Sequence, residues 1–423
     1  MAFADLMLNS QDWVSWTPRG ALSPSFEIDP LGGPSERAAL VVAGQGNPHV
    51  CGCWQLPLPA FVSGRSYRIE VLFQTQGVTS PGKSVRAILT TAQKGLSFYA
   101  HLDDAGQVGD WHKLAFTFLV PDPAPELMLH LFFAWSAFGQ VSWADAQVHE
   151  IVESEDAPLV HVAAISGNPT KPESPAQCLD FYAKQIDALA QPVDLICLPE
   201  LINVTRLPGS GADWAEPIPG PTSELLAEKA REKGAYIAAS IQERQEDAIF
   251  NTGFLLDRSG GLVGKYRKTH PTLSESLLRG VVPGNELPVF YTDFGPIAYM
   301  ICYDGHYPEV ARLLGLKGVQ MILFSNMGDG REGGGLWESV VRTRAVDNQV
   351  YIVAAVNSGR SCVVDPKGEL LAMTDQTPGA VAQAGCDLSA SLCDFSKRPI
   401  HRRYDQLRRA DLFEDLARHL WDD

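Results

Sequence analysis

The chain has 423 residues, of which 45% are hydrophobic and 20% charged, and its formal net charge is -16. This length exceeds what one hydrophobic core usually supports, so we expect an ordinary soluble globular protein with two domains. The acidic balance argues against nucleic acid or an anionic membrane surface as a partner, because both attract basic patches. The sequence shows no signal peptide and no apolar run of membrane-spanning length, which predicts a cytoplasmic location.

The eight cysteines are scattered and form no paired CxxC motif. Cys51 and Cys53 form a single CxC without a nearby pair of histidines or cysteines, a spacing that is more typical of two strand residues on one face than of metal ligands. We therefore expect no metal ion and no other cofactor.

Residues 1–152 show the pattern of an all-β domain. Apolar residues alternate with polar ones over 67–73 and 114–118, and a nearly continuous apolar run covers 127–133. The segment 143–151 resembles the last strand of jelly-roll modules of the carbohydrate-binding type. We therefore predict a jelly-roll-like β-sandwich that could serve in binding or oligomerisation. Glycan binding would require exposed aromatic residues such as Trp54, Trp111 or Trp143, although burial is the commoner state for tryptophan.

An acidic segment that contains a proline, 153–159, predicts a linker. The pattern after it changes to alternating strands and helices. We predict strands over 160–165, 193–198 and 235–241, and helices over 175–189 and 223–233. This alternation indicates an α/β domain with helices outside a sheet, which we assign to residues 160–423 with a helical tail at its C-terminus.

Cys302 ends an apolar strand and precedes a turn and a helix that begins near Pro308 and Glu309. Such a placement holds a nucleophile rigidly and directs backbone N–H groups toward a developing oxyanion. Glu200 also follows an apolar strand, in a Pro-Glu dipeptide, and Lys268 lies in the sequence Arg-Lys-Thr-His. Each segment alone has an ordinary interpretation, namely a packed cysteine, a turn-capping glutamate and a solvated basic turn.

In this order, the three segments resemble those of the nitrilase superfamily of carbon–nitrogen hydrolases. The resemblance covers residues 160–393, includes the Cys-x-Asp-x-x-x-Pro-Glu pattern from Cys302 to Glu309, and extends to the segment 344–357. It implies a four-layer α-β-β-α sandwich and assembly into a dimer or larger homo-oligomer. It also implies that Glu200 is the general base, Cys302 the nucleophile and Lys268 the group that stabilises the oxyanion.

Family members often carry a second glutamate between the lysine and the cysteine. Glu275 is the natural candidate, with Glu286 as the lesser alternative because the following stretch is unusually long. The backbone N–H of Tyr303 would be the second oxyanion donor. Further candidates for substrate binding are Tyr303 and Asp304 after the nucleophile, Asn326 and Met327 after the strand 321–324, and Arg331, with Trp337, in the glycine-rich stretch that follows.

The sequence thus predicts an enzyme that hydrolyses a small-molecule carboxamide or N-carbamoyl compound through a thioester and releases ammonia or an amine. Tyr303-Asp304 favours this branch, because nitrilases usually carry Trp-Glu at these positions. Two alternatives stay open: a nitrilase that converts a nitrile to an acid, and a glycan- or partner-binding protein in which the hydrolase core is only a scaffold.

Overall fold

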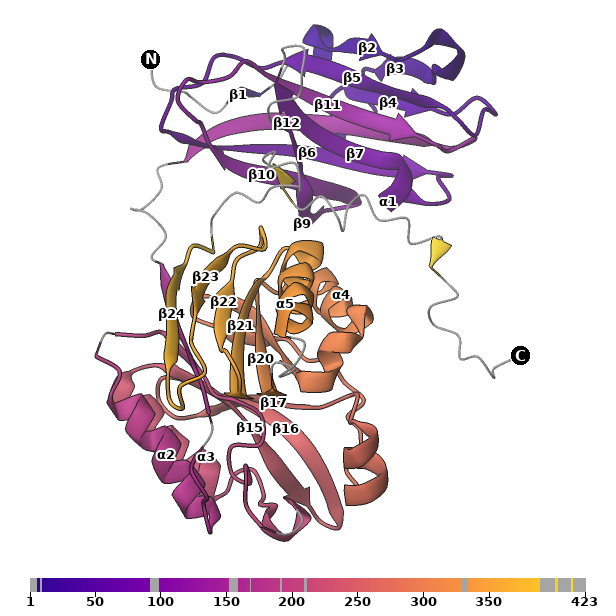
Figure 1. Cartoon of the computed structure of the whole chain (residues 1–423). Helices are drawn as coiled ribbons and strands as arrows, with labels where there is room; N and C mark the ends of the chain where they lie inside the picture. The colour runs from indigo at the N-terminus through magenta and orange to yellow at the C-terminus, as the bar shows by residue number, and fades with distance from the viewer. Residues whose placement is uncertain are drawn as a thin grey trace. The chain divides into compact units, whose positions relative to one another are not determined.

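The computed structural model describes residues 6–7, 10–91, 99–151, 159–167, 169–190, 192–208, 211–328, 334–388, 400–401 and 412–413. The chain forms two compact units (Figure 1). The first comprises Met1–Asp156 together with Ser391–Asp423, and the second comprises Ala157–Ala390. No helix among the described residues is long and apolar enough to cross a membrane.

The first unit contains two β-sheets, whose strands are antiparallel except for one short parallel pair. One sheet has the order β3-β4-β12-β6-β10-β9, with β1 paired to β12, and the other has the order β2-β5-β11-β7-β8-β25. The strands of the first sheet are β1 (Leu6–Met7), β3 (Ser25–Asp29), β4 (Ala39–Ala43), β6 (Ser66–Gln76), β9 (Asp103–Val108), β10 (Trp111–Leu119) and β12 (Gln140–Ile151). Those of the second are β2 (Val14–Trp16), β5 (Cys51–Pro57), β7 (Val85–Thr91), β8 (Tyr99–His101), β11 (Leu127–Ala134) and β25 (Ile400–His401). The only described α-helix of this unit, α1 (Pro81–Ser84), is a single turn.

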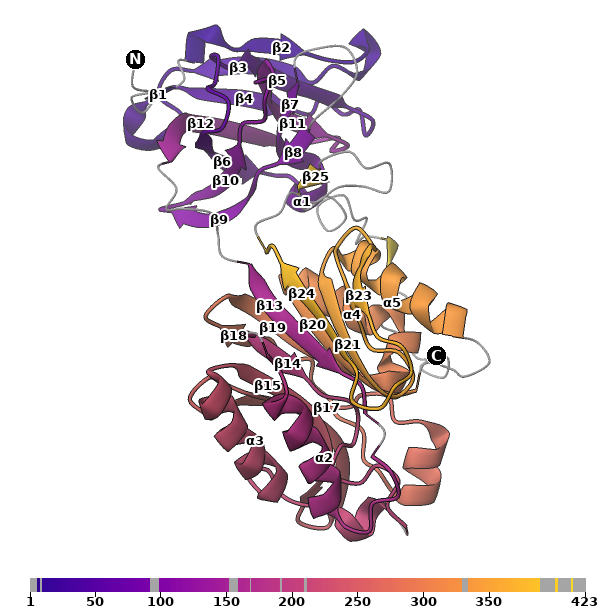
Figure 2. The same cartoon turned by 60° about the vertical axis from the view of Figure 1, so that its left-hand side comes forward.

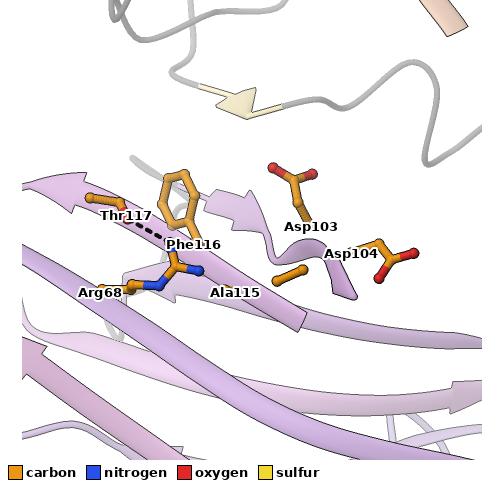
Figure 3. A pocket seen from close by; sticks show the side chains of 7 residues that line it. Arg68, Asp103, Asp104, Ala115, Phe116 and Thr117 are labelled. Carbon is orange, nitrogen blue, oxygen red and sulfur yellow. Dashed lines mark hydrogen bonds between the residues drawn. The ribbon is translucent and has the colours of Figure 1, made fainter. Parts of the chain in front are cut away.

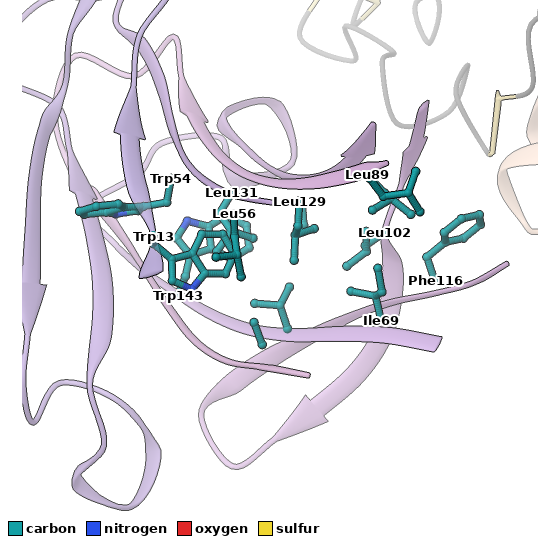
Figure 4. Close-up of a cluster of buried hydrophobic side chains, with 14 of the residues drawn as sticks. Trp13, Trp54, Leu56, Ile69, Leu89, Leu102, Phe116, Leu129, Leu131 and Trp143 are labelled. Carbon is teal, nitrogen blue, oxygen red and sulfur yellow. The ribbon is translucent and has the colours of Figure 1, made fainter. Parts of the chain in front are cut away.

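One hydrophobic core lies between these two sheets (Figure 4). The alternating residues of β6 and β11 point into it, among them Ile69 and Leu129, which have no exposed surface. Trp54 and Trp143 belong to the same core, and Trp111 is buried as well. The predicted β-sandwich is therefore present, whereas its jelly-roll connectivity stays a prediction. The glycan platform that Trp54, Trp111 and Trp143 would have formed is not available, because all three are buried.

Among its described residues, the second unit contains two six-stranded mixed sheets and four α-helices. The first sheet has the order β17-β16-β15-β14-β13-β24 and the second β18-β19-β20-β21-β22-β23. The strands of the first sheet are β13 (Val160–Ile165), β14 (Leu195–Cys197), β15 (Tyr236–Gln245), β16 (Ala248–Leu256), β17 (Leu262–Arg267) and β24 (Val381–Cys386). Those of the second are β18 (Phe290–Thr292), β19 (Gly295–Ile301), β20 (Met321–Gly328), β21 (Tyr351–Ser358), β22 (Cys362–Val364) and β23 (Leu370–Met373). The helices are α2 (Pro175–Asp187), α3 (Pro221–Lys233), α4 (Pro308–Leu316) and α5 (Gly334–Asn348).

Three apolar clusters hold the second unit together in four layers. The first contains residues of both sheets, such as Val162 and Val353, and therefore lies between them. The second joins the outer face of the first sheet to α2 and α3, and the third joins the outer face of the second sheet to α4 and α5. Figures 1 and 2 show the two helix pairs on opposite sides of the paired sheets. This is the expected α-β-β-α arrangement, in which the central strands are buried on both faces.

Two expected boundaries differ from the structure. Ile400–His401, which were expected in the tail of the hydrolase domain, pair with β8 of the first unit. The glycines from Gly328 to Gly335 favour a loop, but α5 already begins at Gly334. Residues 153–158 of the expected linker, and all but 400–401 and 412–413 of the expected helical tail, lie outside the described residues.

Candidate active site

Both sheets of the second unit contribute residues to one cluster of ionisable side chains. Glu200 follows β14 and Lys268 follows β17, both in the first sheet, whereas Cys302 follows β19 in the second. The parallel strands β14 and β19 end at these residues, as is usual for functional groups in α/β proteins. Glu275 lies in the single π-helical turn Ser274–Leu278.

Lys268 joins the two carboxylates. Its Nζ donates to Glu200 Oε1 and to Glu275 Oε2, each at 2.8 Å. The side chain of Lys268 has no exposed surface, and those of Glu200 and Glu275 are 3% and 9% exposed. Glu275 is therefore the second glutamate of the site, whereas Glu286 is exposed. The three charges sum to one negative charge in a water-poor environment.

A fourth polar side chain, that of Asn251 in β16, was missed by the sequence analysis. Its Nδ2 donates to Glu200 Oε1 at 2.7 Å and to Glu275 Oε1 at 2.8 Å. Asn251 is 1% exposed. An asparagine in the middle of an apolar strand was the available signal, because a buried amide needs partners. Two carboxylates, an ammonium group and an amide thus form a closed ring of hydrogen bonds.

The backbone around Glu200 is held by several hydrogen bonds. Leu201, the next residue, has a φ of 53°, a left-handed conformation that is unusual for leucine. Its N–H donates to Ser240 Oγ at 3.2 Å and its carbonyl accepts from Thr205 Oγ1 at 2.7 Å. The Glu200 carbonyl accepts a short hydrogen bond from Asn357 Nδ2. These contacts hold the backbone at Glu200 and Leu201 and offset the cost of the left-handed conformation.

Cys302 is the first residue of the 3₁₀ turn Cys302–His306 and has a φ of 45°, a second strained position in the site. The residue keeps part of its surface accessible. Burial of the sulfur and the negative charge of Glu200 raise the pKa of the Cys302 thiol, whereas Lys268 and the Met327 backbone oppose the rise. The resting sulfur is therefore a thiol next to a carboxylate that can accept its proton.

The pKa values of Lys268 and Glu275 are shifted by their contacts within the ring. Burial alone would lower the pKa of Lys268, but Glu200, Cys302 and Glu275 reverse this effect and raise it. Burial would raise the pKa of Glu275, yet the charge and hydrogen bond of Lys268 lower it. At neutral pH these shifts favour the ammonium form of Lys268 and the carboxylate form of Glu275. Glu200 Oε2 is buried, and no hydrogen-bond partner for it is found among the described residues.

Asp304 was expected to contact the substrate, but in the structure its side chain contacts the protein itself. It is fully buried, and its Oδ2 accepts from the Ile301 N–H at 2.9 Å and from Tyr266 OH at 2.6 Å. Its Oδ1 accepts from the N–H of His270 at 3.0 Å. Asp304 therefore ties the nucleophile turn to the segment after β17, because these bonds occupy both carboxylate oxygens.

The remaining candidates for substrate binding are dispersed. Asn326 is buried, and its Nδ2 donates to the Phe324 carbonyl at 2.8 Å, so its amide supports the end of β20. Tyr303 and Met327 are each 37% exposed and lie directly beside the nucleophile turn and the end of β20. Arg331 lies outside the described residues. No group of three or more metal-ligating side chains with suitable geometry is found in the described part of the chain.

A second feature, in the first unit, is an open pocket of about 490 Å³ (Figure 3). Arg68, Asp103 and Asp104 supply its charged groups, and Phe116 and Thr117 complete one side. Arg68 donates to Thr117 Oγ1 at 3.3 Å and pairs with Glu70 at 2.6 Å. Its cation is therefore already compensated, and the pocket has no nucleophile or buried base comparable to the cluster around Cys302.

Comparison with known proteins supports the assignment of the second unit. Residues 151–391 match the family model described as carbon-nitrogen hydrolase. The human protein named omega-amidase NIT2 is 31% identical over 247 residues, which cover 54% of this chain and 87% of that protein. The mouse protein named deaminated glutathione amidase is 29% identical over 292 residues, covering 63% and 88%.

A solved structure agrees with these matches. The crystal structure of Nit3 from Saccharomyces cerevisiae, described as a member of branch 10 of the nitrilase superfamily, is 25% identical with a TM-score of 0.50. The similarity covers 56% of this chain and 93% of the yeast protein. The chain therefore belongs to the carbon–nitrogen hydrolase family, within the nitrilase superfamily.

Proposed function

We propose that this protein hydrolyses amide-type C–N bonds of a small molecule, a carboxamide or an N-carbamoyl compound, through a thioester on Cys302. The observation that carries this proposal is the buried ring in which Lys268 binds Glu200 and Glu275 at 2.8 Å beside the Cys302 thiol. A nucleophile, a base and a fixed cation are the parts that acyl transfer requires.

In the first half of the reaction, Glu200 takes the thiol proton while the Cys302 sulfur attacks the carbonyl carbon. Transfer has to accompany attack, because burial and the charge of Glu200 raise the pKa of this thiol. The Lys268 ammonium group and the backbone N–H of Tyr303 stabilise the resulting oxyanion. Glu200 then gives its proton to the departing nitrogen, ammonia or an amine leaves, and the carbonyl of the thioester forms again.

In the second half, a water molecule attacks the thioester carbon and Glu200 accepts one of its protons. The tetrahedral intermediate collapses, the C–S bond breaks, and the sulfur recovers the proton held by Glu200. The acid leaves, and the enzyme returns to its starting state with atoms and charges balanced. Glu275 takes no proton in this scheme, because Lys268 keeps it ionised.

Two considerations support amide-type substrates over nitriles. Tyr303 and Asp304 follow the nucleophile where nitrilases usually carry tryptophan and glutamate. The two relatives compared above also carry amidase names. Because Tyr303 in the turn and Met327 near the end of β20 are both partly exposed, we propose that they contact the acyl part of the substrate.

The test is a panel of nitriles, carboxamides and N-carbamoyl compounds, scored by ammonia release. Wild type should release ammonia from at least one carboxamide or N-carbamoyl compound, and Cys302→Ala should abolish it. Cys51→Ala removes another partly exposed thiol, in the first unit, and should leave the rate unchanged. Unreduced activity in Cys302→Ala would exclude the mechanism. Ammonia release from nitriles alone would assign the protein to the nitrilase branch.

A further inference from the structure

The hydrogen bonds of Asn251 indicate that this residue contributes to the site in addition to Glu200, Lys268 and Cys302. Its amide contacts both carboxylates of the site but is not placed to contact the reacting atoms in the proposed scheme. Each Nδ2 hydrogen has an acceptor, one on Glu200 and one on Glu275. Because carboxylates accept and do not donate when ionised, only the NH₂ end of the amide can satisfy both.

Ser240 determines which end of the amide faces the carboxylates. Its Oγ donates to Asn251 Oδ1 at 2.9 Å and accepts the Leu201 N–H at 3.2 Å. The Ser240 hydroxyl hydrogen therefore points to Asn251 Oδ1. If the Asn251 amide were flipped, its NH₂ group would face the Ser240 hydroxyl and its oxygen would face the carboxylates of Glu200 and Glu275. Both Ser240 and Asn251 are buried, so water cannot readily replace these bonds.

We propose that Asn251, oriented by Ser240, is a positioning residue that holds Glu200 and Glu275 at a fixed separation around Lys268. Two carboxylates bound only to one ammonium group could approach the same side of it or rotate apart. The neutral bridge closes the ring on the opposite side without adding charge. It leaves Glu200 Oε1 fully bonded, so that Oε2 is the oxygen that exchanges protons with Cys302 and the substrate.

The bridge also links the carboxylate to its own backbone. The Ser240 hydroxyl connects Asn251 to the N–H of Leu201, the strained residue directly after Glu200. The chain of bonds thus runs from the Glu200 side chain through Asn251 and Ser240 to the next peptide group. Rotation of the carboxylate would have to break this chain, which is why the base stays aimed during both proton transfers.

The inference rests on the proposed function, and the experiment separates the two. Steady-state kinetics are measured for wild type, Asn251→Ala, Asn251→Asp and Ser240→Ala on the best amide of the panel. Asn251→Asp keeps the shape of the side chain but loses both donors and adds a third carboxylate. We expect kcat to fall by about 10- to 100-fold in Asn251→Ala and further in Asn251→Asp, with KM changed by less than about threefold. Ser240→Ala should fall between Asn251→Ala and wild type.

The pH profile distinguishes positioning from a general loss of stability. The ring contains Glu200, Glu275 and Lys268, with Cys302 beside it, and Asn251 donates to both carboxylates. Because such hydrogen bonds favour the ionised carboxylate, removing the Asn251 amide should shift the acid limb of the kcat profile to higher pH. The matched control is Asn203→Ala, which removes another buried amide whose bonds go to the Gln242 backbone. This control should lower the melting temperature without shifting the acid limb.

A second readout does not require turnover. Alkylation of Cys302 by iodoacetamide, followed by mass spectrometry of its peptide, should slow in the Asn251 variants near pH 6–7. Cys51 in the same molecule serves as the internal reference and should react at an unchanged rate. If wild type releases no ammonia from any amide, the proposed function fails, whatever the alkylation shows. If wild type is active and Asn251→Asp matches it in kcat, acid limb and Cys302 alkylation, the positioning role is refuted.

Discussion

Replacing Lys268 by methionine removes one positive charge from the centre of the ring and keeps the length of the side chain. Lys268 has no exposed side-chain surface, and its two carboxylate partners are 3% and 9% exposed, so solvent screens these interactions little. Removing one partner from a buried ion pair costs about 3–5 kcal/mol, because the other charge is left uncompensated. We therefore expect Lys268→Met to lower the free energy of unfolding of the second unit by about this amount at pH 8.

The pH dependence of this loss gives the sharper test. In wild type, the pKa of Glu275 is lowered, so its ionisation stabilises the fold above the unfolded-state pKa and this contribution disappears as the pH falls through the folded-state pKa. In Lys268→Met, burial is no longer opposed by the cation, and the pKa of Glu275 should rise above its unfolded value. The folded variant then binds the proton more tightly than the unfolded chain, so its stability should increase on acidification from pH 8 to pH 5.

Urea unfolding followed by tryptophan fluorescence and circular dichroism at pH 5, 6.5 and 8 measures this difference. The two units are fitted as separate transitions, because a two-unit chain need not unfold in one step. Lys265→Met is the matched control, since Lys265 also pairs with a buried glutamate, Glu243, but its side chain is 31% exposed and Arg267 remains as a partner. It should cost about 0–1 kcal/mol. A loss in Lys268→Met that is the same at pH 5 and pH 8, or no larger than in the control, would refute the reasoning.

Two further substitutions test other parts of the structure. Asp304→Ala leaves the N–H groups of Ile301 and His270 without this acceptor, so it should lower the free energy of unfolding by about 2–5 kcal/mol and slow the alkylation of Cys302. An unchanged melting temperature and alkylation rate would contradict the assignment of Asp304 as a support of the turn. Trp143→Ala opens a cavity in the core of the first unit, where Trp143 has no exposed surface, and should cost about 3–5 kcal/mol in calorimetry. Only the transition of the first unit should move, and an equal shift of both transitions would show that the two units do not unfold independently.

Much of the fold could be predicted from the sequence, because hydrophobic periodicity reports burial directly. The strand over 160–165 was predicted at its observed bounds, and the helices over 175–189 and 223–233 lie within two residues of α2 and α3 at their ends. The beginning of α5 was missed, since Gly334 and Gly335 favour a loop locally and tertiary packing overrides this preference. The pairing of Ile400–His401 with β8 could not be predicted, because a two-residue strand leaves almost no periodic signal.

The clustering of the candidate site residues could be predicted where a residue type alone suggests the chemistry, and their catalytic roles stay predictions. Glu200, Lys268 and Cys302 stand at the ends of strands, and the structure brings them together with Glu275. Asn251 was missed because an asparagine carries no chemistry of its own, and its importance arises only from two partners that are distant in the sequence. Asp304 was placed but given the wrong contacts, since the direction of a side chain in a turn is set by the backbone groups that surround it.

The proposed nucleophile, Cys302, and the proposed base, Glu200, follow strands of different sheets, and this division has a mechanical consequence. Each sheet keeps its own ladder of backbone hydrogen bonds, whereas the two sheets meet through apolar contacts and through a few side-chain hydrogen bonds, such as those of Tyr266 with Asp304 and of Asn357 with the Glu200 carbonyl. A small sliding of one sheet over the other would therefore break only these few bonds, and it would separate sulfur from carboxylate while both ladders stay intact. Activity would then depend on the relative position of the two sheets. Heat or pressure should therefore abolish activity before any strand unfolds.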